Sequence, residues 1–402
     1  MMTTSRSTSV LLCIIFILIG LNLRPSMAAI GPLLNAIRDT IPLSYTVISL
    51  LTMLPVLAMG IAMFIGLRMT QAAGEHRVVS LSLLLIAVAS LFRFIAEDEI
   101  NLLMTAMIAG IGIAMIQSII PQIIKSRFPK HIELFMGVYV TAIMGGAALS
   151  ASTAPFLAEF FDSWQVALSI WAGLAVFALL IWHTMKERLQ NSDHFTPRSS
   201  NRHSSTFQFT RHPRAWLLGM FFGLGTSAYT CVLAWLPPYY FDLGWQDKES
   251  GLILAFLTSM EVLAGLLIPA MASQSVDRRW ILSCLLGSII AGFIGLIIAP
   301  TAYALLWASL LGIGIGGLFP MSLIVTMDHV DDPTQTGKLT TFVQGIGYII
   351  AAMSPLVAGF IKDTYSSFSV AWLILAIIAT MMLFIGWRFK PVDYPLHFAN
   401  AN

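Results

Sequence analysis

Two ionisable side chains, Arg24 and Glu261, stand inside long apolar stretches of this 402-residue chain. A charge at the centre of a bilayer costs about 2.5–3.5 kcal/mol on insertion scales, so such side chains usually face a partner, a cavity or a bound solute. The planar guanidinium keeps its charge and matches flat, delocalised anions. We therefore expect Arg24, in Leu21-Asn22-Leu23-Arg24-Pro25, to bind an anionic or nitro group.

Arg24 has a structural alternative. If the first apolar helix enters the membrane near Val10, Arg24 lies roughly 21 Å further along at 1.5 Å per residue, in the outer half of the bilayer. A long basic side chain can snorkel from there to the outer headgroups, or it can pair with a fixed acid. Glu261 is open to three interpretations. It can carry a proton that is coupled to solute movement, act as a fixed counter-ion to Arg24, or remain a neutral acid that is hydrogen-bonded to a neighbouring helix.

Other polar or aromatic side chains in the apolar runs extend the candidate substrate site. Gln344 and Tyr348 are four residues apart and share one helix face. Trp235 precedes Pro237-Pro238 and has the bulk to close a cavity. Each of these groups could instead make a hydrogen bond between helices. The full set of substrate-binding candidates is Arg24, Asn22, Gln117, Tyr229, Trp235, Gln344 and Tyr348, with Glu261 as the candidate for proton coupling.

The chain lacks the motifs of the common enzyme and metal sites. It contains no HExxH, no GxSxG and no P-loop. The cysteines stand in apolar runs without CxxC spacing, which is typical of small hydrophobic packing residues. The segment 328–332, with sequence Asp-His-Val-Asp-Asp, is interpreted as a solvated loop and not as a metal site. We therefore expect neither enzymatic activity nor a metal or cofactor.

Composition defines the class of protein that must position these residues. Hydrophobic residues make up 57% of the chain, charged residues 10%, and the mean hydropathy is +0.82. A soluble protein carries about 25% charged residues. The chain is therefore expected to be an integral membrane protein that contacts lipid, and its net charge of +2 gives no reason to expect nucleic acid as a partner.

Hydropathy predicts an all-α protein with twelve transmembrane helices. We divide it into an N-terminal six-helix half, 1–185, a polar cytoplasmic linker, 186–212, and a C-terminal six-helix half, 213–402. The predicted spans are 9–33, 45–68, 78–95, 101–124, 134–158, 164–185, 213–240, 249–273, 279–299, 301–326, 336–361 and 367–388.

Basic residues predict the orientation of this bundle. Only Arg38, Arg93, Lys248 and Lys362 fall on the expected outer segments, and Lys and Arg are otherwise concentrated on the inner side. The positive-inside rule then places both termini in the cytoplasm. We expect a multi-pass protein of the bacterial inner membrane.

An internal repeat relates the two halves at an offset of about 200–203 residues. Leu-Gly-Ile-Gly-Ile at 311–315 matches Ala-Gly-Ile-Gly-Ile at 109–113, and Thr341, Gly345 and Pro355 match Thr141, Gly145 and Pro155. Matches in equivalent helices at one offset indicate duplication of a six-helix unit.

These features resemble the major facilitator superfamily and, within it, the branch of cyanate permeases and nitroimidazole exporters. The resemblance runs nearly end to end. It is carried best by 20–25 (GLNLRP), 50–55 (LLTMLP), 121–125 (PQIIK), 234–237 (AWLP) and 344–348 (QGIGY).

The resemblance implies a secondary active transporter that works by alternating access as a monomer. Its substrate would be a small solute such as cyanate or a nitro-heterocycle, moved with or without protons. The alternative is a receptor or scaffold that keeps the fold without transporting.

Overall fold

The computed structural model of the protein describes residues 6–128, 132–184, 206–272, 275, 277–330 and 333–394. The described residues form helices and no strand, and twelve helical segments among them are long and apolar enough to cross a membrane. The prediction of an all-α protein with twelve spans is therefore confirmed. The predicted linker lies outside the described residues from 186 to 205.

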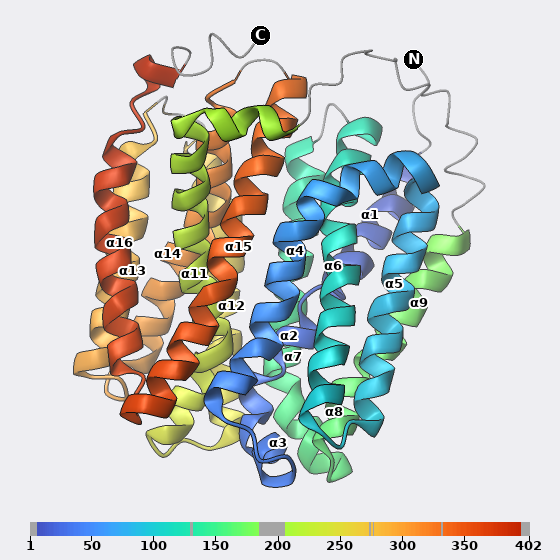
Figure 1. The fold of residues 1–402 in the computed structure, drawn as a ribbon, viewed down its shortest axis with the longest axis vertical. Helices are drawn as coiled ribbons and strands as arrows, with labels where there is room; N and C mark the ends of the chain where they lie inside the picture. Colours follow the sequence, from blue (N-terminus) through green and yellow to red (C-terminus); the bar gives the residue numbers. More distant parts are fainter. Residues whose placement is uncertain are drawn as a thin grey trace.

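The helices up to α9 and the helices from α11 onward stand side by side in the bundle (Figure 1). The first group contains α1 (Arg6–Leu21), α2 (Pro25–Ala28), η1 (Gly31–Leu33), α3 (Leu34–Thr40), α4 (Tyr45–Ala73), α5 (Glu75–Phe92), η2 (Arg93–Ile95), α6 (Glu99–Arg127), α7 (Ile132–Phe161), α8 (Trp164–Ser169) and α9 (Trp171–Thr184). The second contains η3 (Thr206–Arg211), α11 (Pro213–Asp242), α12 (Asp247–Ala272), α13 (Arg279–Ile298), α14 (Ala304–Met327), α15 (Pro333–Tyr365), α16 (Ser369–Trp387) and η4 (Pro391–Asp393).

The first transmembrane segment is broken in its middle, unlike the single span predicted over 9–33. Helix α1 ends at Leu21, and the short helix α2 begins at Pro25. Proline has no N–H to donate, and it disfavours helical geometry at the residue before it. Arg24 accordingly has φ −120° and ψ −23° and caps α2. The break places a charged residue between two helical pieces at membrane depth.

Matched glycines make matched helix contacts in the two groups. A Cβ on Gly110 of α6 would lie 2.4 Å from Cα of Pro55 in α4, and one on Gly112 would lie 2.7 Å from the Ser82 carbonyl oxygen in α5. In the second group, Gly312 and Gly314 of α14 bring that helix equally close to α12 and α13. The same close crossings therefore occur twice, at the offset of the sequence repeat.

The two groups meet through polar contacts at the end of the bundle where α3 lies, which we call the α3 end (Figure 1). Asp363 of α15 accepts hydrogen bonds from the backbone N–H groups of Tyr45 and Thr46, at 3.1 and 2.8 Å, and so caps α4. Asn35 donates to Asp247 at 2.8 Å, and Lys248 pairs with Glu159. These contacts close the bundle at this end.

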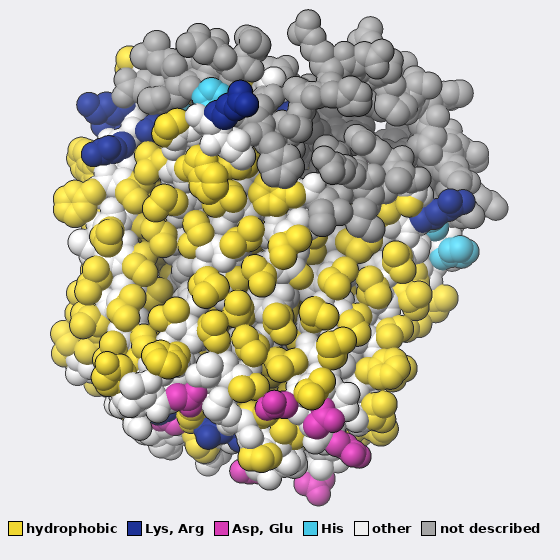
Figure 2. All heavy atoms as spheres, viewed as in Figure 1, with side chains coloured by type: hydrophobic (Ala, Val, Ile, Leu, Met, Phe, Trp, Pro, Cys, Tyr) yellow, Lys and Arg dark blue, Asp and Glu magenta, His cyan; other side chains and the backbone are white. Residues whose placement is uncertain are grey.

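Charge is distributed unevenly along the bundle. In Figure 2, acidic side chains gather at the α3 end of the visible face with a basic side chain among them, most basic side chains lie at the opposite end, and an apolar belt separates the two ends. An apolar belt of this kind is the surface that the hydrocarbon of a bilayer would contact.

Candidate functional site

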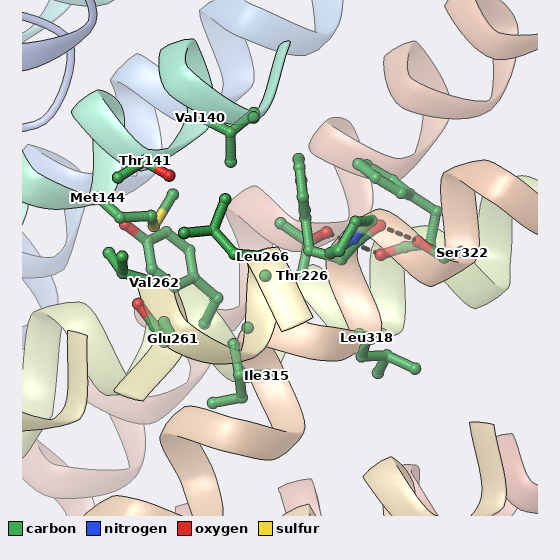
Figure 3. A pocket seen from close by; sticks show the side chains of 18 of the residues that line it. Val140, Thr141, Met144, Thr226, Glu261, Val262, Leu266, Ile315, Leu318 and Ser322 are labelled. Atoms are coloured by element: carbon green, nitrogen blue, oxygen red, sulfur yellow. Dashed lines mark hydrogen bonds between the residues drawn. The ribbon is translucent and has the colours of Figure 1, made fainter. Parts of the chain in front are cut away.

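A cavity lies among helices α7, α11, α12 and α14 (Figure 3), and about 720 Å³ of empty space belongs to it together with the solvent at its mouth. Arg24, at the break in the first segment, also lines it. It occupies the part of the bundle between its middle and the end opposite α3, because its residues come from the first half of α7 and α11 and from the second half of α12 and α14. Its wall is mainly apolar. The side chains that line it include Val140, Thr141, Met144, Phe222, Thr226, Tyr229, Glu261, Val262, Leu266, Ile315, Leu318, Phe319 and Ser322.

Arg24 faces this cavity and not the outer headgroups. Its residue is 3% exposed, and its Nε has no hydrogen-bond partner. Its Cζ lies 5.0 Å from the centroid of the Tyr229 ring, a cation–π contact that stabilises the charge without using its N–H donors. The donors therefore remain available to a bound group.

Glu261 lines the same cavity and is also buried, with 2% of its residue exposed. Neither carboxylate oxygen has a hydrogen-bond partner. Gly316 allows α14 to pack directly on this position, since a Cβ there would lie 2.4 Å from Glu261 Cα. Among the residues that the structure describes, Arg24 and Glu261 form no ion pair with each other or with another residue.

Three tyrosines complete a polar cluster around Arg24. Tyr139, Tyr229 and Tyr348 interact electrostatically with the guanidinium, and each is buried. The hydroxyls of Tyr139 and Tyr229 have no hydrogen-bond partner. Buried hydroxyls normally find a partner, so this cluster can offer donors and acceptors to a solute or water.

Only some of the residues predicted for the substrate site line this cavity. Arg24, Tyr229 and Glu261 line the cavity, whereas Asn22, Gln117, Trp235, Gln344 and Tyr348 are not part of its wall. Tyr348 lies behind the cavity and packs edge-on against Phe222, with ring centroids 5.4 Å apart.

Asn22 and Trp235 have structural partners. The Asn22 amide donates to the Leu18 carbonyl at 2.7 Å, which satisfies one of the carbonyls left free where α1 ends. The Trp235 indole, fully buried, donates to the Pro355 carbonyl at 2.9 Å and packs near Tyr45 of the other group. Trp235 therefore joins helices near the α3 end.

Arg93 makes buried contacts that were not expected from the sequence. It was expected on an outer segment, but it is 1% exposed. Its Nη1 donates to the Ser26 carbonyl at 3.0 Å, and its Nε contacts the Thr105 hydroxyl at 3.3 Å. Ser26 follows Arg24 by two residues, so Arg93 holds the chain just beyond the break.

Tyr139, Thr226 and Ser322 were also absent from the predicted site. Thr226 and Ser322 line the cavity but donate to carbonyls in their own helices, at 2.8 Å each. A tyrosine in an apolar run was the available signal for Tyr139. Nothing in the sequence distinguishes the apolar wall residues from ordinary packing residues.

The described part of the segment 328–332 is more buried than the solvated loop that was expected there. Residues 331 and 332 lie outside the described residues. His329 is 3% exposed, and its Nε2 accepts a hydrogen bond from Arg214 at 3.0 Å. Asp328 pairs with Arg278 at 3.3 Å. Burial raises the pKa of Asp328 above its ordinary value, and the Arg278 charge acts in the opposite direction.

Comparisons with known proteins agree with this architecture. Residues 10–352 and 242–401 match the Major Facilitator Superfamily. The chain is 38% identical over 382 residues to the cyanate transport protein CynX of Escherichia coli (strain K12), covering 95% of this chain and 98% of that one. It is 28% identical over 370 residues to the 2-nitroimidazole transporter of the same organism, covering 92% and 93%.

Solved structures share the fold at low sequence identity. A bacterial homologue of the human lysosomal transporter Spinster, inward-facing and unoccupied, gives a TM-score of 0.76 at 16% identity and covers 99% of both chains. A D-xylose–proton symporter gives 0.74 at 15% identity, covering 95% of this chain and 98% of that one.

Twelve apolar spans among the described residues, together with the similarity to named transporters, identify a membrane transport protein and not an enzyme. The chain belongs to the Major Facilitator Superfamily. It is a multi-pass inner-membrane protein and a secondary transporter of a small solute, as predicted.

Proposed function

We propose that the transported solute is a small anion such as cyanate or a nitro-heterocycle, and that Arg24 is its anchor. The observation that carries this proposal is a buried guanidinium with an unpartnered Nε facing a central cavity. The guanidinium could donate two parallel hydrogen bonds to a flat anionic or nitro group, which would satisfy its unpartnered N–H. The similarity to proteins named as cyanate and 2-nitroimidazole transporters supports the same solute classes.

Transport would occur by alternating access. In this proposal the two halves, 1–185 and 213–402, rock about the cavity, and the linker 186–212 connects them in the cytoplasm. Contacts between the halves close the α3 end, while the cavity extends toward the opposite end. Outward opening requires Asp363 to leave α4 and Asn35 to leave Asp247.

The α3 end would face the periplasm and both termini the cytoplasm. Basic side chains at the end opposite α3, including Arg77, Arg278 and Arg279, support this orientation. The described structure would then be closed to the outside. We expect the monomer to be the transporting unit.

Glu261 is our candidate for coupling to protons. A buried carboxyl in the solute cavity can gain or lose a proton as the cavity faces each side. Glu261→Gln removes titration but keeps the shape, so it should abolish accumulation driven by a proton gradient while solute exchange continues. Undiminished accumulation in this variant would restrict Glu261 to another role.

Flux into proteoliposomes tests the proposed solutes. Purified protein should move labelled cyanate or 2-nitroimidazole across the vesicle membrane, and each transported solute should also raise the thermal stability of the detergent-solubilised protein, since ligands stabilise the state they bind. Absence of flux and of stabilisation with both compounds would overturn these assignments while leaving the family membership intact.

A further inference from the structure

The cavity is lined by two unpartnered ionisable groups, one basic and one acidic. Arg24 and Glu261 both line it, are 3% and 2% exposed, and lack partners on Nε and on both carboxylate oxygens, respectively. Buried charged groups are costly without a partner, so an occupant that satisfies only one of them leaves the other unsatisfied. A bare anion at Arg24 would in addition be repelled by an ionised Glu261.

We propose that the cavity is a two-ended site whose occupant presents an accepting edge to Arg24 and an N–H or O–H donor to Glu261. This inference rests on the proposed function and specifies the ligand more narrowly. The occupant is a small, flat, polar molecule with both kinds of group, as in an azole that keeps its ring N–H. A simple anion lacks the second group and binds only when Glu261 carries a proton.

The remainder of the cavity fits such a molecule. Most of its wall is apolar, and Val140, Met144, Val262 and Leu266 are among the residues that line the space (Figure 3). An apolar wall favours a ring over a hydrated ion.

The charged and titratable groups around Glu261 are few. Arg24 interacts with it electrostatically, as does Tyr229 of α11. Tyr139 of α7 and Tyr348 of α15 interact electrostatically with Arg24, and neither belongs to the cavity wall. Helix α14 adds no titratable side chain to the described cavity wall. Glu261 is therefore the acceptor best placed to take a ligand donor.

The test compares two isomers, 4-methyl-2-nitroimidazole, which keeps a ring N–H, and 1-methyl-2-nitroimidazole, which does not. Their affinities for the purified full-length protein are measured by calorimetry. We expect the N–H isomer to bind about ten- to a hundred-fold more tightly, the effect of one hydrogen bond to a charged group. That advantage should disappear in Glu261→Leu and persist in Thr380→Ala, a change in α16 away from the cavity wall, where the hydroxyl donates to the Ala376 carbonyl.

Several results would overturn this inference. Equal affinities for the isomers in the wild type, or an advantage that persists in Glu261→Leu, would show that Glu261 does not receive a ligand donor. Cyanate serves as the anion control. If cyanate binds and depends on Arg24 while neither isomer binds, the cavity is an anion site only and the proposed function stands. If none of the three compounds binds, the proposed solutes fail as well.

Discussion

Arg93 is expected to position Arg24 without touching the solute. Arg93→Met removes the donor to the Ser26 carbonyl and should lower the free energy of unfolding by about 1.5–3 kcal/mol. Because the released segment carries Arg24, solute affinity should fall as well. Arg93→Lys keeps one donor and should restore part of both.

Calorimetric affinity and thermal unfolding, measured on the same preparations, check this prediction. A loss of stability with unchanged affinity would limit Arg93 to a structural role. The matching comparison is Asn22→Ala, which removes the cap on the Leu18 carbonyl at the other side of the break.

Of the residues expected at the site, Arg24, Glu261 and Tyr229 line the cavity. Arg24 and Glu261 stood out because a charge in an apolar run needs an explanation. Asn22 and Gln344 looked equally suitable, since an amide in a helix can face a solute, its own backbone or a neighbouring helix. Sequence spacing does not decide among these directions. Arg93 was missed because its position near a span end resembles that of an exposed loop residue.

At the level of elements, the contact between α12 and α14 should be intolerant of added volume. Gly316→Ala would place a methyl group 2.4 Å from Glu261 Cα, which requires the helices to separate. We expect a loss of about 1–3 kcal/mol in stability and a displaced Glu261. The control is Gly287→Ala in α13, where an added Cβ meets no heavy atom within 4 Å.

Thermal unfolding in detergent measures the effect. The Gly316 variant should unfold at a lower temperature than the wild type, and the Gly287 variant should not. Equal unfolding temperatures for both variants would mean that α12 and α14 can separate without cost.

The cap that Asp363 forms on α4 should help to hold the α3 end closed. Asp363→Asn removes a charge from the N-terminus of α4 and weakens two backbone hydrogen bonds that cross between the helix groups. We expect more molecules with an open α3 end. Spin labels on cysteines at Asp39 and Leu243, in a background without the native cysteines, should report longer distances.

Asp242→Asn is the matched control for Asp363. Asp242 pairs with Lys362, and both belong to the same helix group. That variant should leave the label distances unchanged. Equal changes of the label distance in both variants, or no change in Asp363→Asn, would show that the Asp363 cap does not hold the α3 end closed.

Helix bounds were predictable to within a few residues because each span is a continuous apolar run. The predicted 279–299 and 367–388, for example, correspond to Arg279–Ile298 and Ser369–Trp387. The break at 22–24 could be suspected from Pro25 but not located, because many helices accommodate an internal proline, as α4 does at Pro55. How the broken pieces are held depends on distant residues such as Arg93.

For the whole molecule, the orientation has a direct test. A reporter fused after Asn402 should show cytoplasmic activity, because basic side chains are concentrated at the end opposite α3. A second reporter inserted at Glu97, between η2 and α6 at the α3 end, should show periplasmic activity. Reversed activities would invert the proposed orientation, and activity of both reporters on one side would contradict the arrangement of the spans.

The central claim is that the solute binds at Arg24 in the cavity, and the half-saturation concentration for uptake by proteoliposomes tests it most directly. Variants Arg24→Lys and Gln344→Ala are compared after equal reconstitution. An ammonium keeps the charge but loses the planar fork, so Arg24→Lys should raise the half-saturation concentration about ten- to a hundred-fold. Gln344 does not line the cavity, and its variant should remain near the wild type. Near-normal uptake by Arg24→Lys together with impaired uptake by Gln344→Ala would contradict the account and place the site against α15.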